Sequence, residues 1–375
     1  MSEWKTVRLG DYITEYSVKN KSNEDIPVYS VTNTQGFCTE YFSKDVSSKD
    51  KSNYKIVPRG CFAYNPSRIN VGSVDWQRYE DRVIVSPLYN VFKVSPELEN
   101  QYLYYFLKSD IGHTLITSKA EGSVRDNLKI TMLAEFSIPL PPLETQKLIA
   151  AQLDKCTALI AKHKQMLEKY DTLIKSRFIE MFGDPVLNPM GWEEKKLGNI
   201  CTKISDGVHA KPEYTSTGKP FISVVNINSG KLLFDDCKYV SEEAYEKMIK
   251  STHPEKGDVL YTKVGATYGI PALVDTDKDF CLYVSVALLK PKSEIVNSQF
   301  LTISMAQPYI KNQADKRIKG IGVPDLHLNQ IREFDILLPP LELQNQFKAF
   351  VQQIDKSKFE IANSLKRLYN KGMLS

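Results

Sequence analysis

The feature that most constrains this chain is a stretch of 40 residues, from Leu143 to Phe182, that contains neither glycine nor proline. Two prolines immediately precede it, and Gly183 and Pro185 follow it. Proline before a segment and glycine after it are typical of helix boundaries. A helix of this length would extend about 60 Å. It is too long for the interior of a compact domain, so we expect it to pack against a partner helix and to hold other parts of the chain apart.

Residues along this stretch repeat at alternating spacings of four and three, which is the pattern of a heptad seam. An ordinary amphipathic core helix shows the same pattern, so one seam alone does not establish a coiled coil. Arg177 is the one interruption of the seam. Its other members are Ile149, Leu153, Cys156, Ile160, His163, Leu167, Tyr170, Ile174 and Met181.

A second seam follows a second copy of the same short motif. The motif Leu-Pro-Pro-Leu-Glu-x-Gln occupies residues 140–146 and again residues 338–344, an offset of 198. Lys358 is a polar member of the second seam, and a polar residue at such a position can fix the register of paired helices. Two seams opened by one motif favour a pair of helices. The second seam comprises Phe347, Val351, Ile354, Lys358, Ile361, Leu365 and Leu368.

The remainder of the chain is also duplicated, which indicates two similar globular units. The offset between the copies grows from 188 to 198, so the second copy carries about ten more loop residues. We expect domains at 1–143 and 183–341, with long helices at 144–182 and 342–375. The matching segments are Trp4-x4-Leu9-Gly10 with Trp192-x4-Leu197-Gly198, residues 27–33 with 220–226, and Gly60, Tyr64 and Gly72 with Gly257, Tyr261 and Gly269.

Within each unit, short runs rich in Val, Ile, Tyr and Phe alternate with turn residues, which is typical of β-strands. These runs are 27–31, 83–94, 220–226, 258–263 and 283–289, and helical patterns occur at 101–109 and 298–307. We therefore predict an α+β protein in which two similar mixed α/β domains are joined and separated by two long antiparallel coiled-coil helices. Antiparallel pairing would return the second helix to the first unit, and would give the chain a pseudo-twofold axis.

Composition gives little support to a nucleic-acid partner and none to a membrane. The net charge is +4, and residues 1–143 carry 17 basic against 17 acidic side chains, while residues 183–341 carry 19 against 20. A DNA-binding surface would therefore require charges to be sorted to one face. No apolar run approaches the roughly 20 residues of a membrane span, and the first residues do not resemble a signal peptide. We expect a cytoplasmic protein.

No catalytic site or metal site is predicted from the residue spacings. The six cysteines form no CxxC pair and the five histidines no HxxxH pair, so buried free thiols are expected. A phosphate-binding loop of the GxxxxGK[ST] type is absent from the sequence. Residues 64–67 are similar to the Asn-Pro-Pro-aromatic motif of amino-methyltransferases, but Ser67 replaces the second proline and no glycine-rich cofactor loop lies upstream.

Candidate binding loops are polar, contain glycine, and occur at equivalent places in the two copies. They span residues 65–73 and 121–129 in the first copy, and 205–211, 262–269 and 316–320 in the second. Arg, Lys, Asn and Thr side chains read base edges and contact phosphates, although each loop could equally be a plain surface turn. The candidate DNA contacts are Arg68, Asn70, Ser73, Arg125, Asn127, Lys129, His209, Lys211, Lys263, Thr267, Tyr268, Arg317 and Lys319.

These motifs together resemble the specificity subunit of Type I restriction–modification systems. The resemblance rests on the two Trp-x4-Leu-Gly openings, the two Leu-Pro-Pro-Leu-Glu-x-Gln motifs, and Ile179-Glu-Met-Phe-Gly-Asp-Pro185 after the first long helix. It implies that each globular unit is a target-recognition domain for half of a bipartite DNA sequence. It also implies that the helices set the gap between the halves.

The same resemblance implies partners that carry the chemistry. Two methyltransferase subunits would dock on the helices and adjoining surfaces, and restriction subunits would complete the nuclease. S-adenosylmethionine and ATP with Mg²⁺ would bind those partners, and this chain would be non-catalytic. Two alternatives remain open from the sequence: a coiled-coil scaffold that does not bind DNA, and a self-sufficient methyltransferase or nuclease.

Overall fold

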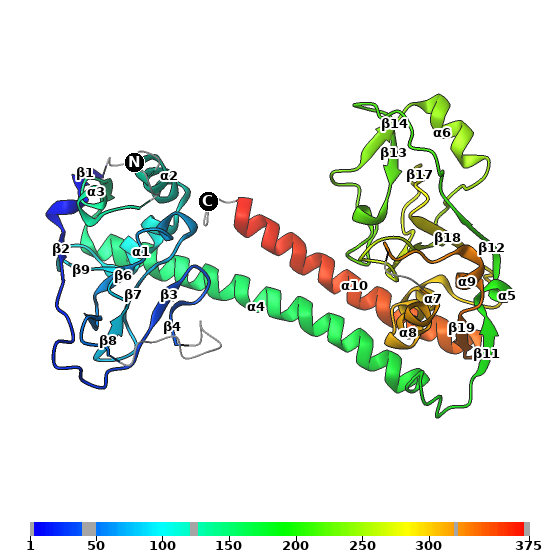
Figure 1. Cartoon of the computed structure of the whole chain (residues 1–375), viewed down its shortest axis with the longest axis horizontal. Helices are drawn as coiled ribbons and strands as arrows, with labels where there is room; N and C mark the ends of the chain where they lie inside the picture. Colours follow the sequence, from blue (N-terminus) through cyan, green and yellow to red (C-terminus); the bar gives the residue numbers. More distant parts are fainter. Residues whose placement is uncertain (1–3, 40–49, 121–126, 319–321, 371–375) are drawn as a thin grey trace. The chain divides into compact units, whose positions relative to one another are not determined.

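The computed structural model describes residues 4–39, 50–120, 127–318 and 322–370. The chain divides into two compact units. Unit 1 comprises Met1–Gln165 together with Ala362–Ser375, and unit 2 comprises Met166–Ile361. Each unit therefore contains one globular part and a portion of each long helix (Figure 1).

Unit 1 is a mixed α/β structure whose described strands are short. Its elements are β1 (Lys5–Arg8), the 3-10 helix η1 (Leu9–Asp11), β2 (Ile13–Glu15), β3 (Ser30–Thr32), β4 (Gly36–Cys38), β5 (Lys55–Pro58), β6 (Phe62–Tyr64), η2 (Ile69–Val71), β7 (Val74–Trp76), β8 (Arg82–Val85), β9 (Asn90–Val94), α1 (Asn100–Lys108), α2 (Asp110–Ala120), α3 (Ile130–Leu133), β10 (Ser137–Leu140) and the first part of α4 (Leu143–Phe182).

Unit 2 has the same general order of elements. After the end of α4 come β11 (Glu193–Lys196), α5 (Leu197–Ile200), β12 (Cys201–Asp206), β13 (Lys219–Ile222), η3 (Val224–Asn226), β14 (Lys238–Val240), α6 (Glu242–Ile249), β15 (Val259–Thr262), β16 (Pro271–Leu273), β17 (Cys281–Leu282), β18 (Val286–Pro291), α7 (Ser298–Met305), α8 (Pro308–Arg317), α9 (Leu328–Arg332), β19 (Asp335–Leu338) and α10 (Leu341–Asn370).

The two units share the topology of their principal sheet. Its strand order is β2-β9-β6-β7 in unit 1 and β12-β18-β15-β16 in unit 2, and all neighbours are antiparallel. A separate antiparallel pair joins the first strand of each unit to its last, β1 with β10 and β11 with β19. The prediction of two similar mixed α/β domains is confirmed. The units differ in their smaller sheets, which are β3-β4 and β5-β8 in unit 1 and β14-β13-β17 in unit 2.

The Leu-Gly dipeptide that opens each unit has a packing role. In unit 1 the Leu9 amide donates to Phe136 O at 2.8 Å and the Gly10 amide to Ala134 O at 2.8 Å. A Cβ atom on Gly10 would lie only 2.8 Å from Ala134 O, so only glycine allows this approach. In unit 2 the Leu197 amide makes the equivalent 2.8 Å bond to Phe334 O. The motif therefore fixes the first strand of a unit beside its last.

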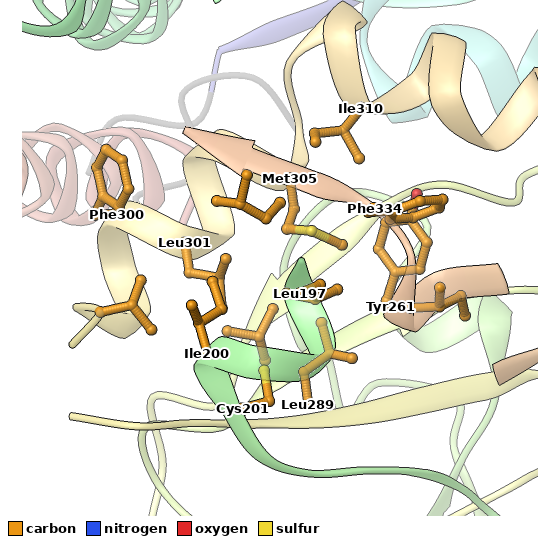
Figure 2. Close-up of a cluster of buried hydrophobic side chains, with 14 of the residues drawn as sticks. Leu197, Ile200, Cys201, Tyr261, Leu289, Phe300, Leu301, Met305, Ile310 and Phe334 are labelled. Carbon is orange, nitrogen blue, oxygen red and sulfur yellow. The ribbon is translucent and has the colours of Figure 1, made fainter. Parts of the chain in front are cut away.

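Each unit has its own hydrophobic core. In unit 1, Phe62 and Phe92 stack with ring centroids 5.0 Å apart beneath helix α1 residues such as Leu103. In unit 2, Figure 2 shows side chains of α5, the principal sheet, α7 and α8 converging on one cluster. The labelled members are Leu197, Ile200, Cys201, Tyr261, Leu289, Phe300, Leu301, Met305, Ile310 and Phe334.

Helices α4 and α10 pack together, and their contacts within unit 2 run antiparallel. The rings of Phe178 and Phe347 lie 5.6 Å apart, and Lys358 Nζ donates to Asp171 Oδ1 at 2.5 Å. Residues earlier in α4 therefore contact residues later in α10, which is the predicted antiparallel arrangement.

The less exposed stripe of each helix follows the predicted seams. On α10, Phe347, Val351, Ile354 and Ile361 are buried and Leu365 is half-buried. On α4, Ile160 is buried, whereas Ile149, Leu153, Leu167, Tyr170 and Ile174 are half-buried.

A buried glutamine fixes the start of each long helix. Gln146 Oε1 accepts from the Glu99 amide at 2.8 Å, and its Nε2 donates to Glu97 O and Pro141 O at 3.0 and 2.9 Å. In unit 2, Gln344 Oε1 accepts from the Asn297 amide at 2.8 Å, and its Nε2 donates to Ile295 O at 3.3 Å and Pro339 O at 2.8 Å. The last residue of the repeated motif thus joins each long helix to the N-terminus of α1 or α7.

Several details of the predicted secondary structure were wrong. The run 220–226 is a strand only to Ile222 and then forms η3, and the run 283–289 becomes a strand only at Val286. The run 83–94 is not one strand but two, β8 and β9, because Pro87 lies between them and lacks the amide hydrogen that a sheet ladder requires. The run 27–31 becomes a strand only from Ser30, which pairs with Cys38 in a short hairpin. Helices α2, α6 and α8 were not predicted.

Candidate nucleic-acid interface

In both units, a loop at an equivalent place follows the third strand in the order of the principal sheet, which is β6 in unit 1 and β15 in unit 2. In unit 1 it runs from Asn65 to Ser73, and the Asn65 amide donates to Ser73 O at 3.4 Å. In unit 2 it follows β15, and the Gly269 amide donates to Thr262 O at 2.8 Å. Gly72 and Gly269 have φ angles of +88° and +91°, in the left-handed region that favours glycine. The glycines seen in the sequence therefore close the loops.

A second segment lies against this loop in both units. In unit 1 the Leu128 amide donates to Pro66 O at 3.1 Å, and the buried Tyr64 hydroxyl donates to Leu128 O at 3.0 Å. In unit 2 the Leu326 amide donates to Lys263 O at 2.9 Å. The predicted loops at 65–73 and 121–129 therefore meet at residues 66 and 128. In unit 2 the loop after β15 meets the segment immediately before α9.

The candidate residues of unit 1 differ in exposure. Arg68 and Lys129 are exposed, and Asn127 is half-buried. Asn70 is half-buried, and its Oδ1 has no hydrogen-bond partner among the described residues. Ser73 is buried, and its hydroxyl donates to Val31 O at 2.9 Å. Arg125 lies outside the described residues.

A charged cluster that the residue spacings do not indicate supports the unit 1 loop. Lys108 Nζ, from α1, donates to Gly72 O and to Asn33 O, the latter at 3.2 Å. The buried Asp75 accepts from the Phe37 amide at 3.1 Å and pairs with Arg78. Burial lowers the pKa of Lys108, and the charge of Asp75 opposes this shift. Asp75 and Arg78 are three residues apart, but Lys108 comes from α1, so spacing alone does not reveal that the three charges meet.

The candidate residues of unit 2 include three exposed side chains, His209, Lys211 and Thr267. Lys211 Nζ lies 5.8 Å from the centroid of the Tyr214 ring. Other candidates are occupied within the unit. Arg317 donates to Gln313 O at 2.8 Å and Glu333 O at 2.9 Å, and the half-buried Tyr268 donates to Asp315. Lys319 lies outside the described residues.

Lys263 is a candidate DNA contact that is buried inside unit 2. Only 4% of the residue is accessible, and its Nζ lies 3.4 Å from Asp206 Oδ2 and 3.5 Å from Asp325 Oδ1. His209 Nε2 lies 3.5 Å from Asp206 Oδ1. Three of the predicted or adjoining loops of unit 2 therefore converge on one ammonium group.

The described residues contain no cluster of three or more His, Cys, Asp or Glu side chains that could hold a metal ion. All six cysteines lie in described segments, and none forms a disulfide. No helix in the described ranges has both the length and the apolar character needed to cross a membrane.

Comparison with known families agrees with the repeated architecture. Residues 1–169 and 189–368 match the Type I restriction modification DNA specificity domain. The chain belongs to this family. Each matched range contains one copy of the principal sheet and most of one long helix. The resemblance predicted from the motifs is confirmed.

Relatives of this DNA specificity chain are specificity subunits of Type I restriction enzymes. The MjaVIII specificity subunit of Methanocaldococcus jannaschii is 24% identical over 403 aligned positions, which cover 98% of this chain and 91% of that protein. The EcoBI specificity subunit of Escherichia coli is 25% identical over 274 positions, which cover 65% of this chain and 57% of that protein. The chain thus matches less than two thirds of the length of the EcoBI relative.

Two solved structures share the fold of this specificity chain. The S subunit of a Type I restriction–modification system from M. genitalium has a TM-score of 0.60 at 15% identity, with 99% of this chain and 95% of that chain covered. A chain from a structure of a type I R-M system has a TM-score of 0.58 at 19% identity, with 100% and 96% covered. At these identities the likeness concerns the fold alone.

Proposed function

We propose that this chain is the DNA sequence-recognition subunit of a Type I restriction–modification complex, and that each unit reads one half of a bipartite target. The observation that carries this proposal is the repetition of one loop pair on one sheet topology within a DNA specificity family. A duplicated reading unit suits a target with two specific tracts, because each copy can present its own set of side chains to one tract.

The proposal assigns a role to each part of the chain. Residues 1–143 and 183–341 form the two target-recognition domains, and residues 144–182 and 342–375 form the spacer helices that set the gap between half-sites. The buried Gln146 and Gln344 support this division, because each couples a spacer helix to the globular part beside it. A rigid connection is needed if helix length is to determine where two domains meet DNA.

The chemistry of the complex is assigned to partner subunits. The chain positions two methyltransferase subunits, and restriction subunits where present, on double-stranded DNA in the cytoplasm. S-adenosylmethionine would serve methyl transfer, and ATP with Mg²⁺ would serve the restriction subunits. In this proposal the specificity chain itself breaks and forms no covalent bonds.

Exposure divides the candidate contacts into two groups. Arg68, Lys129, His209, Lys211 and Thr267 are exposed and can meet DNA without rearrangement. We propose these side chains as direct contacts, since Arg and Lys bind phosphates and base edges, and Thr and His can hydrogen-bond to either. Ser73 and Arg317 are engaged inside their units, so their proposed contribution is to the shape of the loops.

Mapping of methylated bases tests this function directly. DNA from cells with and without this gene, in the presence of the partner subunits, should differ at one bipartite motif with a fixed gap. An electrophoretic shift of the purified chain with DNA should strengthen as salt is lowered, because phosphate contacts release counterions. Identical methylation maps together with salt-independent or absent DNA binding would favour a protein scaffold instead.

A further inference from the structure

We infer that Lys263 is a positioning residue that holds three loops of unit 2 in one arrangement, and that it does not itself contact DNA. The inference rests on the proposed DNA-reading function of these loops. Lys263 follows β15, whereas Asp206 lies at the end of β12 and Asp325 lies before α9. The ammonium group stands between the two carboxylates, at 3.4 Å from Asp206 Oδ2 and 3.5 Å from Asp325 Oδ1.

Backbone hydrogen bonds join the Lys263 segment to the segment of Asp325 and to Ser285. The Lys263 amide donates to Ser285 O at 3.0 Å, and its carbonyl accepts from the Leu326 amide at 2.9 Å. Two residues later, the Gly265 amide donates to Pro324 O at 2.9 Å. The Lys263 side chain adds the third loop, because Asp206 begins the segment that carries the exposed His209. One residue thus joins the segments that present the exposed candidates His209, Lys211 and Thr267.

The charges explain why this residue orders the loops. A buried ammonium group is costly unless it is paired, and the side chain of Lys263 is only 5% exposed. The side chains of Asp206 and Asp325 are 14% and 44% exposed, so both carboxylates remain partly hydrated. Removing the ammonium group would leave two facing carboxylates without a counter-charge, and we expect the loops to separate.

Unit 1 uses a different arrangement at the equivalent position. The two copies are offset by 197 residues here, so Pro66 of unit 1 is equivalent to Lys263 of unit 2. The Pro66 carbonyl accepts from the Leu128 amide at 3.1 Å, which matches the bond between the Lys263 carbonyl and the Leu326 amide. Proline has no side-chain charge. A substitution at Lys263 should therefore affect only the half-site that unit 2 reads.

The test compares Lys263→Met with Lys211→Ala in the full chain. Each variant is titrated across a salt series with a duplex selected from a random library by the unaltered chain, and with a scrambled duplex. For Lys263→Met we expect the preference for the selected duplex to fall at least about tenfold, at one half-site, with an unchanged slope of log K against log salt. For the exposed Lys211→Ala we expect the slope to fall by about 0.9, as for one lost phosphate contact.

Two results of the titration would overturn the inference: a slope reduced by about 0.9 in Lys263→Met, which marks a phosphate contact, or an unchanged preference at both half-sites. Hydrogen exchange without DNA gives an independent reading. The amides of Val208 and Leu326, which donate to Leu282 O and Lys263 O, should exchange faster in Lys263→Met. Unchanged exchange would also overturn the inference.

The design separates this inference from the proposed function. If the unaltered chain prefers no duplex, the proposed function fails, whereas the exchange experiment still decides the role of Lys263. If Lys263→Met does not fold, the variant Asp206→Asn/Lys263→Met/Asp325→Asn, in which all three charged side chains are replaced by neutral ones, takes its place. We expect that variant to fold and still to lose preference at one half-site, and full retention of preference would contradict the inference.

Discussion

Gln146 and Gln344 are fully buried, and each carboxamide joins the start of a long helix to the segment before a shorter one. We predict that Gln344→Leu lowers the free energy of unfolding of unit 2 by about 3 kcal/mol, because the Asn297 amide and two carbonyl groups lose a buried partner. Chemical denaturation measures this effect. The exposed Gln352→Leu on the same helix is the control, and it should change stability by less than about 0.5 kcal/mol. Equal effects of the two substitutions would contradict the prediction.

Asp75 gives unit 1 a predictable dependence on pH. Burial raises the pKa of Asp75, and the charge of Arg78 only partly opposes this. The folded state then keeps a proton on Asp75 at pH values where the unfolded chain has lost it. Stability therefore falls as pH rises from the ordinary aspartate pKa through the raised pKa of Asp75. In Asp75→Asn this component should disappear, so the unaltered chain should lose stability relative to the variant across that interval.

Denaturation of unit 1 at a series of pH values measures the difference. Asp81 is the matched control, because its side chain is fully exposed in a pair with Arg59. Asp81→Asn should leave the pH dependence of the unaltered chain in place. Parallel stability curves for Asp75→Asn and the unaltered chain would show that Asp75 does not carry this dependence.

Residue types and spacing predicted which loops were candidates but not which way their side chains face. Lys263 was expected to contact DNA, yet its carboxylate neighbours lie 57 and 62 residues away in the sequence. Ser73 was expected in the same role, and it donates to Val31 O, 42 residues away. The sequence contains these partners but gives no sign of the pairing, because the topology of the sheet brings them together.

At the scale of elements, the end of α4 is held by aromatic packing. The Phe178 ring lies 5.0 Å from that of Phe182, 5.8 Å from that of Phe300 and 5.6 Å from that of Phe347. It therefore links α4 with α7 and α10 inside the unit 2 core. We predict that Phe178→Ala destabilises unit 2 by about 4 kcal/mol, the cost typical of a cavity left by a buried phenylalanine.

Hydrogen exchange along residues 170–182 checks that prediction, since the amides of α4 should exchange faster when its anchor is lost. Ile179 is the neighbouring control, because it is 42% exposed. Ile179→Ala should cost less than about 1 kcal/mol. Comparable losses for the two variants would show that the aromatic cluster is not what fastens the helix.

The long elements were predicted well because their signal is local and repeated. The boundaries of α4, Leu143–Phe182, follow the segment without glycine or proline, and its less exposed positions follow the heptad spacing. The short strands depend on pairing with distant strands, so their limits were less accurate. Pro87, in the middle of the predicted run 83–94, is the local signal that separates β8 from β9.

At the scale of the whole molecule, the repeat is the basis of the functional proposal. Both units place the glycine-closed loop after the equivalent strand, and both fasten a second segment to it by a backbone hydrogen bond. The loops themselves have the same length from Tyr64 to Gly72 and from Tyr261 to Gly269 but differ in charge, as shown by Pro66 and Lys263 at equivalent positions. One scaffold with two different loop sets is what a subunit that reads two different half-sites requires.

The proposed spacer role predicts the effect of shortening α4. Deleting residues 158–164 removes one heptad, keeps the phase of the seam to within about 20°, and leaves Gln146 and the Asp171–Lys358 pair in place. A heptad accounts for about 10 Å of helix, equivalent to about 3 base pairs of DNA at roughly 3.4 Å each. We therefore expect methylation mapping to show two unchanged half-sites with a gap about 3 base pairs shorter, or a loss of methylation at the original target.

Lys162→Ala/Lys164→Ala changes exposed residues of the same segment without changing its length, and should leave the gap as it was. If the shortened chain directs methylation to the original sequence with its original gap, the helices do not measure the distance between half-sites.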